Sequence, residues 1–145
     1  MTCDGTDIYI CGEGWYNKTP YALVFNITTQ ESIHVDDYDS QFKSVIANKD
    51  YLIAVGNAAA ETSGCYDGLI VIFDKSLNVV NKRRYSNSKY TQLDKVEVSY
   101  DKVLERDVIK CSGSLLIGDK EHRCSITLDC LLNILSVRIE NSDED

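Results

Sequence analysis

The chain has 145 residues, 43% of them hydrophobic and 26% charged, a composition that fits one folded domain or repeat array and excludes a disordered chain. Its formal net charge is −8, so its surface repels phosphate backbones and nucleic acid is not expected as a partner. No apolar run is long enough to span a bilayer and no amino-terminal signal peptide is evident, which predicts a cytoplasmic protein without a membrane partner.

The apolar residues are mainly Val, Ile, Leu and Tyr, whose side chains fit the half-buried surface of a pleated sheet. The sequence has a single proline, Pro20, and strands tolerate proline badly because it lacks a backbone N–H donor. Both features predict an all-β fold.

Three segments of the chain share one pattern. Each has a strand that ends near a glycine, then a polar loop, then a second strand that closes on Asn or Asp. The strand pairs are 7–12 with 21–26, 50–56 with 67–74, and 107–113 with 123–129. The closing glycines Gly12, Gly56 and Gly113 are 44 and then 57 positions apart, spacings typical of propeller blades.

Each copy continues with a short turn and a third strand, expected over 32–35, 78–81 and 133–139. A fourth strand, over 41–47 and 93–100, leads into the second and third copies. Copy one starts at its second strand and is therefore incomplete. The predicted repeats cover approximately residues 1–38, 39–88 and 89–140, and 141–145 form an acidic tail.

The second copy carries the most specific motif. Residues 66–74 read Y-D-G-L-I-V-I-F-D and precede a turn and a strand that ends at Tyr85. This resembles bacterial and archaeal β-propeller repeats in which a D-G-x-hydrophobic-V-x-F-D strand precedes such a turn and strand. Copy one has Tyr21-Ala22 and copy three Arg123-Cys124 where Asp67-Gly68 stand. The resemblance implies three four-stranded propeller-like repeats, half of a propeller, and it carries no catalytic residues.

Three blades do not close an ordinary propeller ring, which has four to eight, and an open array exposes strand edges and apolar faces. Three interpretations remain open. Two chains can combine into a six-bladed ring, the chain can be a piece of a longer propeller, or the strands can fold as a sandwich or irregular barrel. We favour the homodimer, since twofold pairs are the commonest oligomers.

No catalytic, cofactor or metal site is predicted. His34 and His122, the only histidines, lack the spacing of metal ligands, and the acidic cluster 36–40 lacks the Gly and distal Glu of a calcium loop. The basic run Lys82-Arg83-Arg84 is interpreted as a solvated strand end or turn rather than a binding patch.

Six cysteines are present and none forms a C-x-x-C pair, so buried free thiols and structural disulfides are both open interpretations. The best disulfide candidate joins Cys111 and Cys124, on the strands that flank the hairpin of copy three. Trp15, Tyr16 and Tyr21 lie in or beside the loop of copy one and are candidate interface residues. Trp15 is interpreted as a core plug or a subunit contact.

The leading functional hypothesis is a non-enzymatic scaffold or protein-interaction module that self-associates or binds a protein partner, with no cofactor. The alternative is a propeller that binds, or hydrolyses, a small molecule or carbohydrate. Such a pocket needs convergent groups from equivalent loops, and the three loops here differ in sequence, which favours the scaffold.

Overall fold

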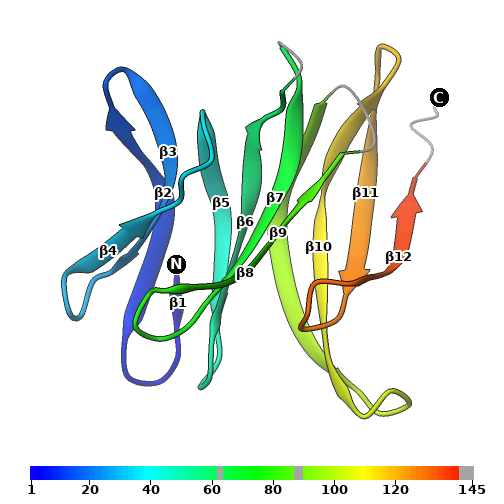
Figure 1. The fold of residues 1–145 in the computed structure, drawn as a ribbon. Helices are drawn as coiled ribbons and strands as arrows, with labels where there is room; N and C mark the ends of the chain where they lie inside the picture. Colours follow the sequence, from blue (N-terminus) through cyan, green and yellow to red (C-terminus); the bar gives the residue numbers. More distant parts are fainter. Residues whose placement is uncertain (62–63, 87–89, 141–145) are drawn as a thin grey trace.

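The computed structural model describes residues 1–61, 64–86 and 90–140, which contain twelve β-strands and no helix, so the all-β prediction is confirmed (Figure 1). The strands are β1 (Thr2–Cys3), β2 (Ile8–Tyr16), β3 (Thr19–Asn26), β4 (Glu31–His34), β5 (Ser40–Ala47), β6 (Leu52–Ala59), β7 (Tyr66–Phe73), β8 (Val79–Tyr85), β9 (Tyr90–Asp101), β10 (Arg106–Ile117), β11 (Lys120–Leu128) and β12 (Ile134–Ile139). The predicted acidic tail, 141–145, lies outside the described residues.

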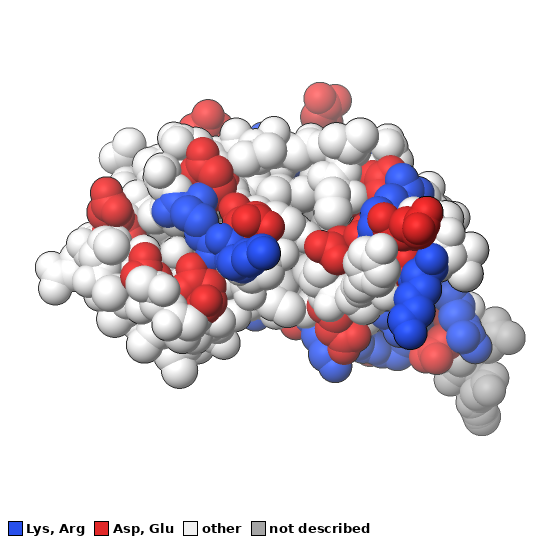
Figure 2. Space-filling view, turned by 90° about the horizontal axis from the view of Figure 1, so that it is seen from below, with Lys and Arg blue, Asp and Glu red and all other residues white. Residues whose placement is uncertain are grey.

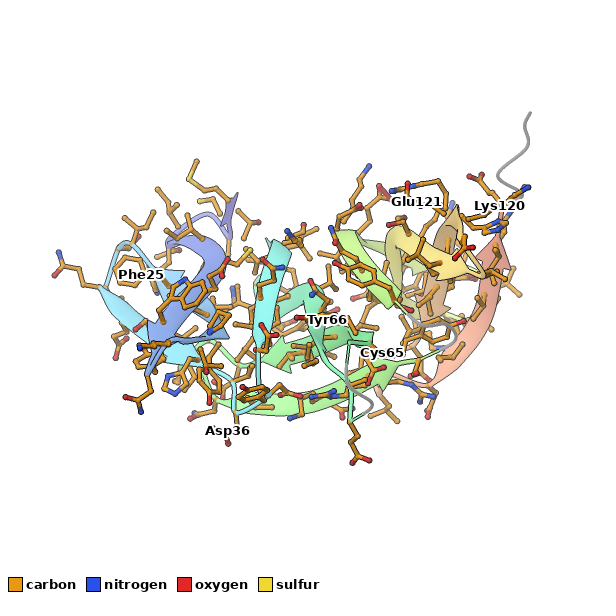
Figure 3. The ribbon with its side chains drawn as sticks, turned by 90° about the horizontal axis from the view of Figure 1, so that it is seen from above. Phe25, Asp36, Cys65, Tyr66, Lys120 and Glu121 are labelled. Carbon is orange, nitrogen blue, oxygen red and sulfur yellow. The ribbon has the colours of Figure 1, made fainter. Side chains whose placement is uncertain are left out.

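The strands form three antiparallel meanders, β1–β4, β5–β8 and β9–β12, here called the first, second and third sheets. The first is a separate four-stranded sheet. The other two are joined into one eight-stranded sheet by a single parallel pair, Tyr66 with Tyr90. Seen from above, the three sheets stand side by side and fan apart (Figure 3). The described strands form no closed barrel.

The second sheet is buried on both of its faces. Its central strands β6 and β7 read L-I-A-V-G-N-A-A and Y-D-G-L-I-V-I-F, and almost every residue in them is buried. Because neighbouring side chains in a strand point to opposite faces, alternate residues pack on different neighbours. Leu52, Ala54, Leu69 and Val71 pack against the first sheet; Ile53, Val55, Ile70 and Ile72 pack against the third. Coverage on both sides explains why these strands are continuously apolar rather than alternating.

Two of the periodic glycines are required by close backbone approach. A Cβ on Gly56 would lie 1.9 Å from the carbonyl oxygen of Gln41, and one on Gly113 would lie 1.9 Å from that of Gln92. At both places the register shifts by one residue, which marks a β-bulge in the pairing of β5 with β6 and of β9 with β10. The same device therefore recurs in the second and third sheets.

A second repeated device, which the sequence analysis missed, is the turn D-x-x-L-N at 74–78 and 129–133. In each turn the Asp carboxylate accepts the backbone N–H of the closing Asn, at 2.8 Å, and also its side-chain amide. The Leu in each turn, Leu77 and Leu132, has positive φ and a buried side chain. An Asp followed four residues later by Asn, in both copies, is the sequence signal that reveals this turn.

Two expectations about element boundaries were wrong. The loop expected over 13–20 is only a two-residue turn, Asn17-Lys18, with positive φ at both residues, so β2 and β3 extend to it. His122 lies in β11, and β8 ends at Tyr85, as the motif of the second copy predicts. The first copy is not without its first strand: the two-residue β1 pairs with Ile8 and Tyr9.

We expect Gly56→Ala and Gly113→Ala each to lower the free energy of unfolding by about 3 kcal/mol, because a methyl group there collides with a backbone carbonyl that cannot move aside. Gly12→Ala is the matched control, since a Cβ at Gly12 meets nothing within 4 Å. Urea denaturation of the three variants measures the difference. Equal stability of all three would contradict the close approach.

Candidate functional site

One face of the first sheet is open, and it is apolar. The register places on it the residues Ile8, Ile10, Tyr16, Tyr21, Leu23, Phe25, Ser32 and His34. Ile8 and Ile10 are each 38% exposed and Tyr16 is 46% exposed. None of the strand residues on this face is Lys, Arg, Asp or Glu, and Phe25 projects away from the other two sheets (Figure 3). We call this surface the open face.

The open face corresponds to the faces that the second and third sheets cover. The equivalent cross-strand residue pairs of the three sheets are Ile10 with Phe25, Ala54 with Val71, and Cys111 with Ile126. The second pair is buried against the first sheet, and the third pair is buried against the second. Only the first pair has no sheet packed on it among the described residues.

The opposite end of the molecule has a polar outer face. The strands of the third sheet place there Lys95, Glu97, Lys110, Ser112, Arg123, Ser125, Thr127, Ser136 and Arg138. Seen from below, most of the visible basic side chains gather at this end (Figure 2). Since terminal repeats of a stacked array need a polar outer face, the third sheet caps the stack and the first sheet does not.

The three aromatic residues singled out from the sequence do not form one group. Tyr16 and Tyr21 lie on the open face, where their rings are 4.8 Å and 6.0 Å from that of His34. Trp15 points to the other face of β2 and is 64% exposed, which rules out the core plug. All three residues lie on the strands of the β2–β3 hairpin rather than in a loop.

Trp15 lines a separate cavity of about 300 Å³ above the second sheet. Its lining residues are Glu13, Trp15, Pro20, Asp39, Ser40, Gln41, Asn57, Tyr66 and Tyr90. The Tyr66 hydroxyl donates to the Asp39 carboxylate, and this bond raises the pKa of Tyr66 to about 12. The Oδ1 atom of Asn57, a residue only 2% exposed, has no hydrogen-bond partner in the described part of the chain.

All six cysteines are free thiols, and the Cys111–Cys124 disulfide suggested by the sequence is not formed. Cys124 pairs with Gly113 and Cys111 with Ile126, so the two cysteines are diagonal rather than directly opposite. Burial raises the pKa of Cys111 to about 12 and also raises the pKa of Cys124. Both therefore act as small apolar side chains of the core.

The histidines and acidic residues are not brought together. His34 lies on the first sheet, and His122 contacts the Glu140 carbonyl in the third. Asp37 and Asp39 are bound to basic and tyrosine side chains instead of converging on an ion. Across 1–61, 64–86 and 90–140, no group of three or more His, Cys, Asp or Glu side chains could hold a metal.

The basic run lies at the end of β8, where Lys82 and Arg83 are exposed, and it also contacts both neighbouring sheets. Lys82 and Arg84 point towards the first sheet and bind the Asp37 carboxylate at 2.7 Å and 2.8 Å. Arg83 points the other way and donates to the carbonyl of Leu132 in the third sheet. β8 thus connects both neighbours of the second sheet through alternate side chains.

Asp37 is the buried partner in this arrangement, with 6% of its surface exposed. Burial alone would raise the pKa of its carboxyl. The hydrogen bonds from Lys82 and Arg84 outweigh that effect, so the pKa of Asp37 is lowered. The ionised carboxylate is therefore the form that stabilises the contact between the first and second sheets.

No protein-family model matches the chain, and no curated protein is significantly similar to it. No helix capable of crossing a membrane occurs in the described residues. Any functional conclusion therefore depends on the geometry of the open face and the cavity.

We expect Asp37→Asn to lower the free energy of unfolding at pH 7 by about 2 kcal/mol, because two partly exposed cations lose their buried partner. The carboxylate has a lowered pKa when folded, so its contribution is present above the unfolded value of about 3.9 and is lost as the pH falls through the folded value. Denaturation at several pH values should show the difference from the wild type shrinking below about pH 4.

Asp94→Asn is the matched control, since Asp94 pairs with Arg123 at an exposed position. Its effect should be below about 1 kcal/mol at every pH. An Asp37→Asn effect no larger than this would show that β8 does not stabilise the stack through Asp37.

Proposed function

We propose that this chain is a non-enzymatic protein-interaction module, built of propeller-type blades, that self-associates through the open face. The observation that supports it most is the equivalence of the open face with the two faces that the chain itself covers with a sheet. A contiguous apolar surface without strand charges, on an otherwise acidic protein, is typical of an interaction site.

The polar outer face of the third sheet disfavours a six-bladed ring and favours a dimer in which two open faces are in contact. A six-bladed ring would press Lys110, Arg123 and Arg138 of one copy against the apolar open face of the other, and burying unpaired charges there is costly. Two open faces in contact bury mainly apolar and aromatic groups, and no strand Lys, Arg, Asp or Glu. That contact is related by a twofold axis, so it closes at the dimer and leaves the polar faces outside.

The four-strand meander, the repeated glycine bulge and the repeated D-x-x-L-N turn support the propeller-type description. In the second and third sheets these devices occupy equivalent positions. The three sheets also fan apart, as neighbouring blades do (Figure 3).

Light scattering at several concentrations tests the self-association. We expect a dimer of twice the 16.3 kDa chain mass, and Leu23→Lys should weaken it about 30-fold or more, since it places an unpaired charge in the centre of the contact. Ser125→Lys, on the polar face of the third sheet, should leave the mass unchanged. A wild-type monomer at all concentrations, or equal effects of the two variants, would reject the open-face dimer.

The cavity beside Trp15 supports a second candidate function, the binding of a small organic amine. Three of its lining residues are aromatic, two are carboxylates and none is Lys or Arg. Aromatic faces and carboxylates attract ammonium groups, and the Asn57 Oδ1 atom is an acceptor without a donor. These groups come from the first, second and third sheets, so the cavity depends on the assembled stack.

Trp15 is the only tryptophan, so its fluorescence reports on this cavity. We expect n-butylammonium to change the emission and neutral n-butanol, which has the same chain, to leave it unchanged. Glu13→Gln should weaken the response several-fold by removing a charge, whereas Glu121→Gln, at the far hairpin, should not. A response to the alcohol equal to that of the amine would reject an amine site.

A further inference from the structure

The edge of β2 that lies away from β3 has no described strand as partner over most of its length. β1 pairs only with Ile8 and Tyr9, so no described strand pairs with the side of β2 from Ile10 to Tyr16 that lies away from β3. In the other two sheets the equivalent edges are paired over nearly their whole length. β5 covers β6 from Leu52 to Ala58, and β9 covers β10 from Arg106 to Leu116.

The two strands that occupy the equivalent edges share a sequence. Residues 40–45 read S-Q-F-K-S-V and residues 91–96 read T-Q-L-D-K-V. In both, the large apolar residue lies directly opposite the glycine: Phe42 opposite Gly56, and Leu93 opposite Gly113. The next residue is the bulge, and the following pair restores the register. The pattern [S/T]-Q-[F/L]-x-x-V therefore describes the strand that this type of edge accepts.

Gly12 holds in β2 the place that Gly56 and Gly113 hold in β6 and β10, but no described strand pairs beside it. In the second and third sheets the strand on this edge places a carbonyl 1.9 Å from where the Cβ of the glycine would lie. At Gly12 that space is empty, since nothing lies within 4 Å. The partner of Gly12 across the sheet is Leu23, as the partner of Gly56 is Leu69, so the backbone register is also the same.

We propose that the edge of β2 from Ile10 to Tyr16 is a binding site for an extended peptide segment of the pattern [S/T]-Q-[F/L]-x-x-V, which adds antiparallel to β2 as a strand of the first sheet. Backbone hydrogen bonds supply the general affinity for such a strand, and side-chain pockets supply the selectivity. The large apolar residue opposite Gly12 points onto the open face, beside Ile10 and Leu23, as Phe42 and Leu93 point into the two cores.

The backbone of the segment adds to the edge of β2, and only its large apolar side chain reaches the open face used in the proposed self-association. We assign the segment to a partner protein, since both segments of the given sequence that match the pattern are already paired within it. The inference rests on the same interaction-module function, but peptide binding and oligomeric mass are separate measurements.

The test uses the full chain labelled with ¹⁵N and a capped peptide of residues 90–96, Tyr-Thr-Gln-Leu-Asp-Lys-Val. We expect amide shifts along 10–16 and contacts between the peptide Leu and Gly12. Gly12→Val should weaken binding about tenfold or more, because its side chain occupies the place of the incoming carbonyl. It should not reduce thermal stability, since the site is empty in the free protein.

His34→Val is the matched variant, on the open face but at the opposite edge of the sheet, and it should bind the peptide as the wild type does. A peptide with Asp in place of the Leu, and a scrambled peptide, should bind at least tenfold more weakly. Absence of binding to the wild type, or equal binding by Gly12→Val, overturns the inference. Loss of self-association in Gly12→Val without any peptide binding also overturns it and places a second copy on the edge.

Discussion

The architecture depends on one constraint, which is that an apolar sheet face has to be covered. The second sheet is apolar on both faces, so it is stable only between two neighbours. The first and third sheets are those neighbours, and each covers one side. The outer faces of the two terminal sheets have no described sheet covering them, and they differ in polarity. The third sheet presents charged and hydroxyl side chains, and the first presents Ile, Leu, Phe and Tyr.

Much of the strand arrangement could be predicted from the sequence, because strand signals are local. Alternating or continuous runs of branched residues located nearly every strand, and the periodic glycines aligned the copies. Hairpin lengths were harder. The turn at Asn17-Lys18 needs positive φ at two residues, and nothing in E-G-W-Y-N-K-T-P sets them apart from a polar loop. The contact of the basic run of β8 with Asp37 could not be predicted, because Asp37 lies more than forty residues earlier in the chain.

The candidate site was less predictable, for a physical reason. Both faces of the first sheet carry apolar side chains, and such a strand sequence does not distinguish one covering neighbour from two. Tyr16 and Tyr21 share the open face, but Trp15 belongs to the other face and to a different cavity. Which face is open follows only from the order of the sheets, and that order is a property of the tertiary structure.

The face and the edge of the first sheet have complementary physical roles. Apolar burial on the open face is nondirectional, so by itself it sets neither the register nor the identity of what packs there. Strand pairing at the edge of β2 fixes direction and register, but unpaired backbone groups accept almost any extended chain. Gly12 lies where the two surfaces meet, and its missing side chain admits the bulge that only some segments form. A partner that uses both surfaces therefore obtains affinity from one and selectivity from the other.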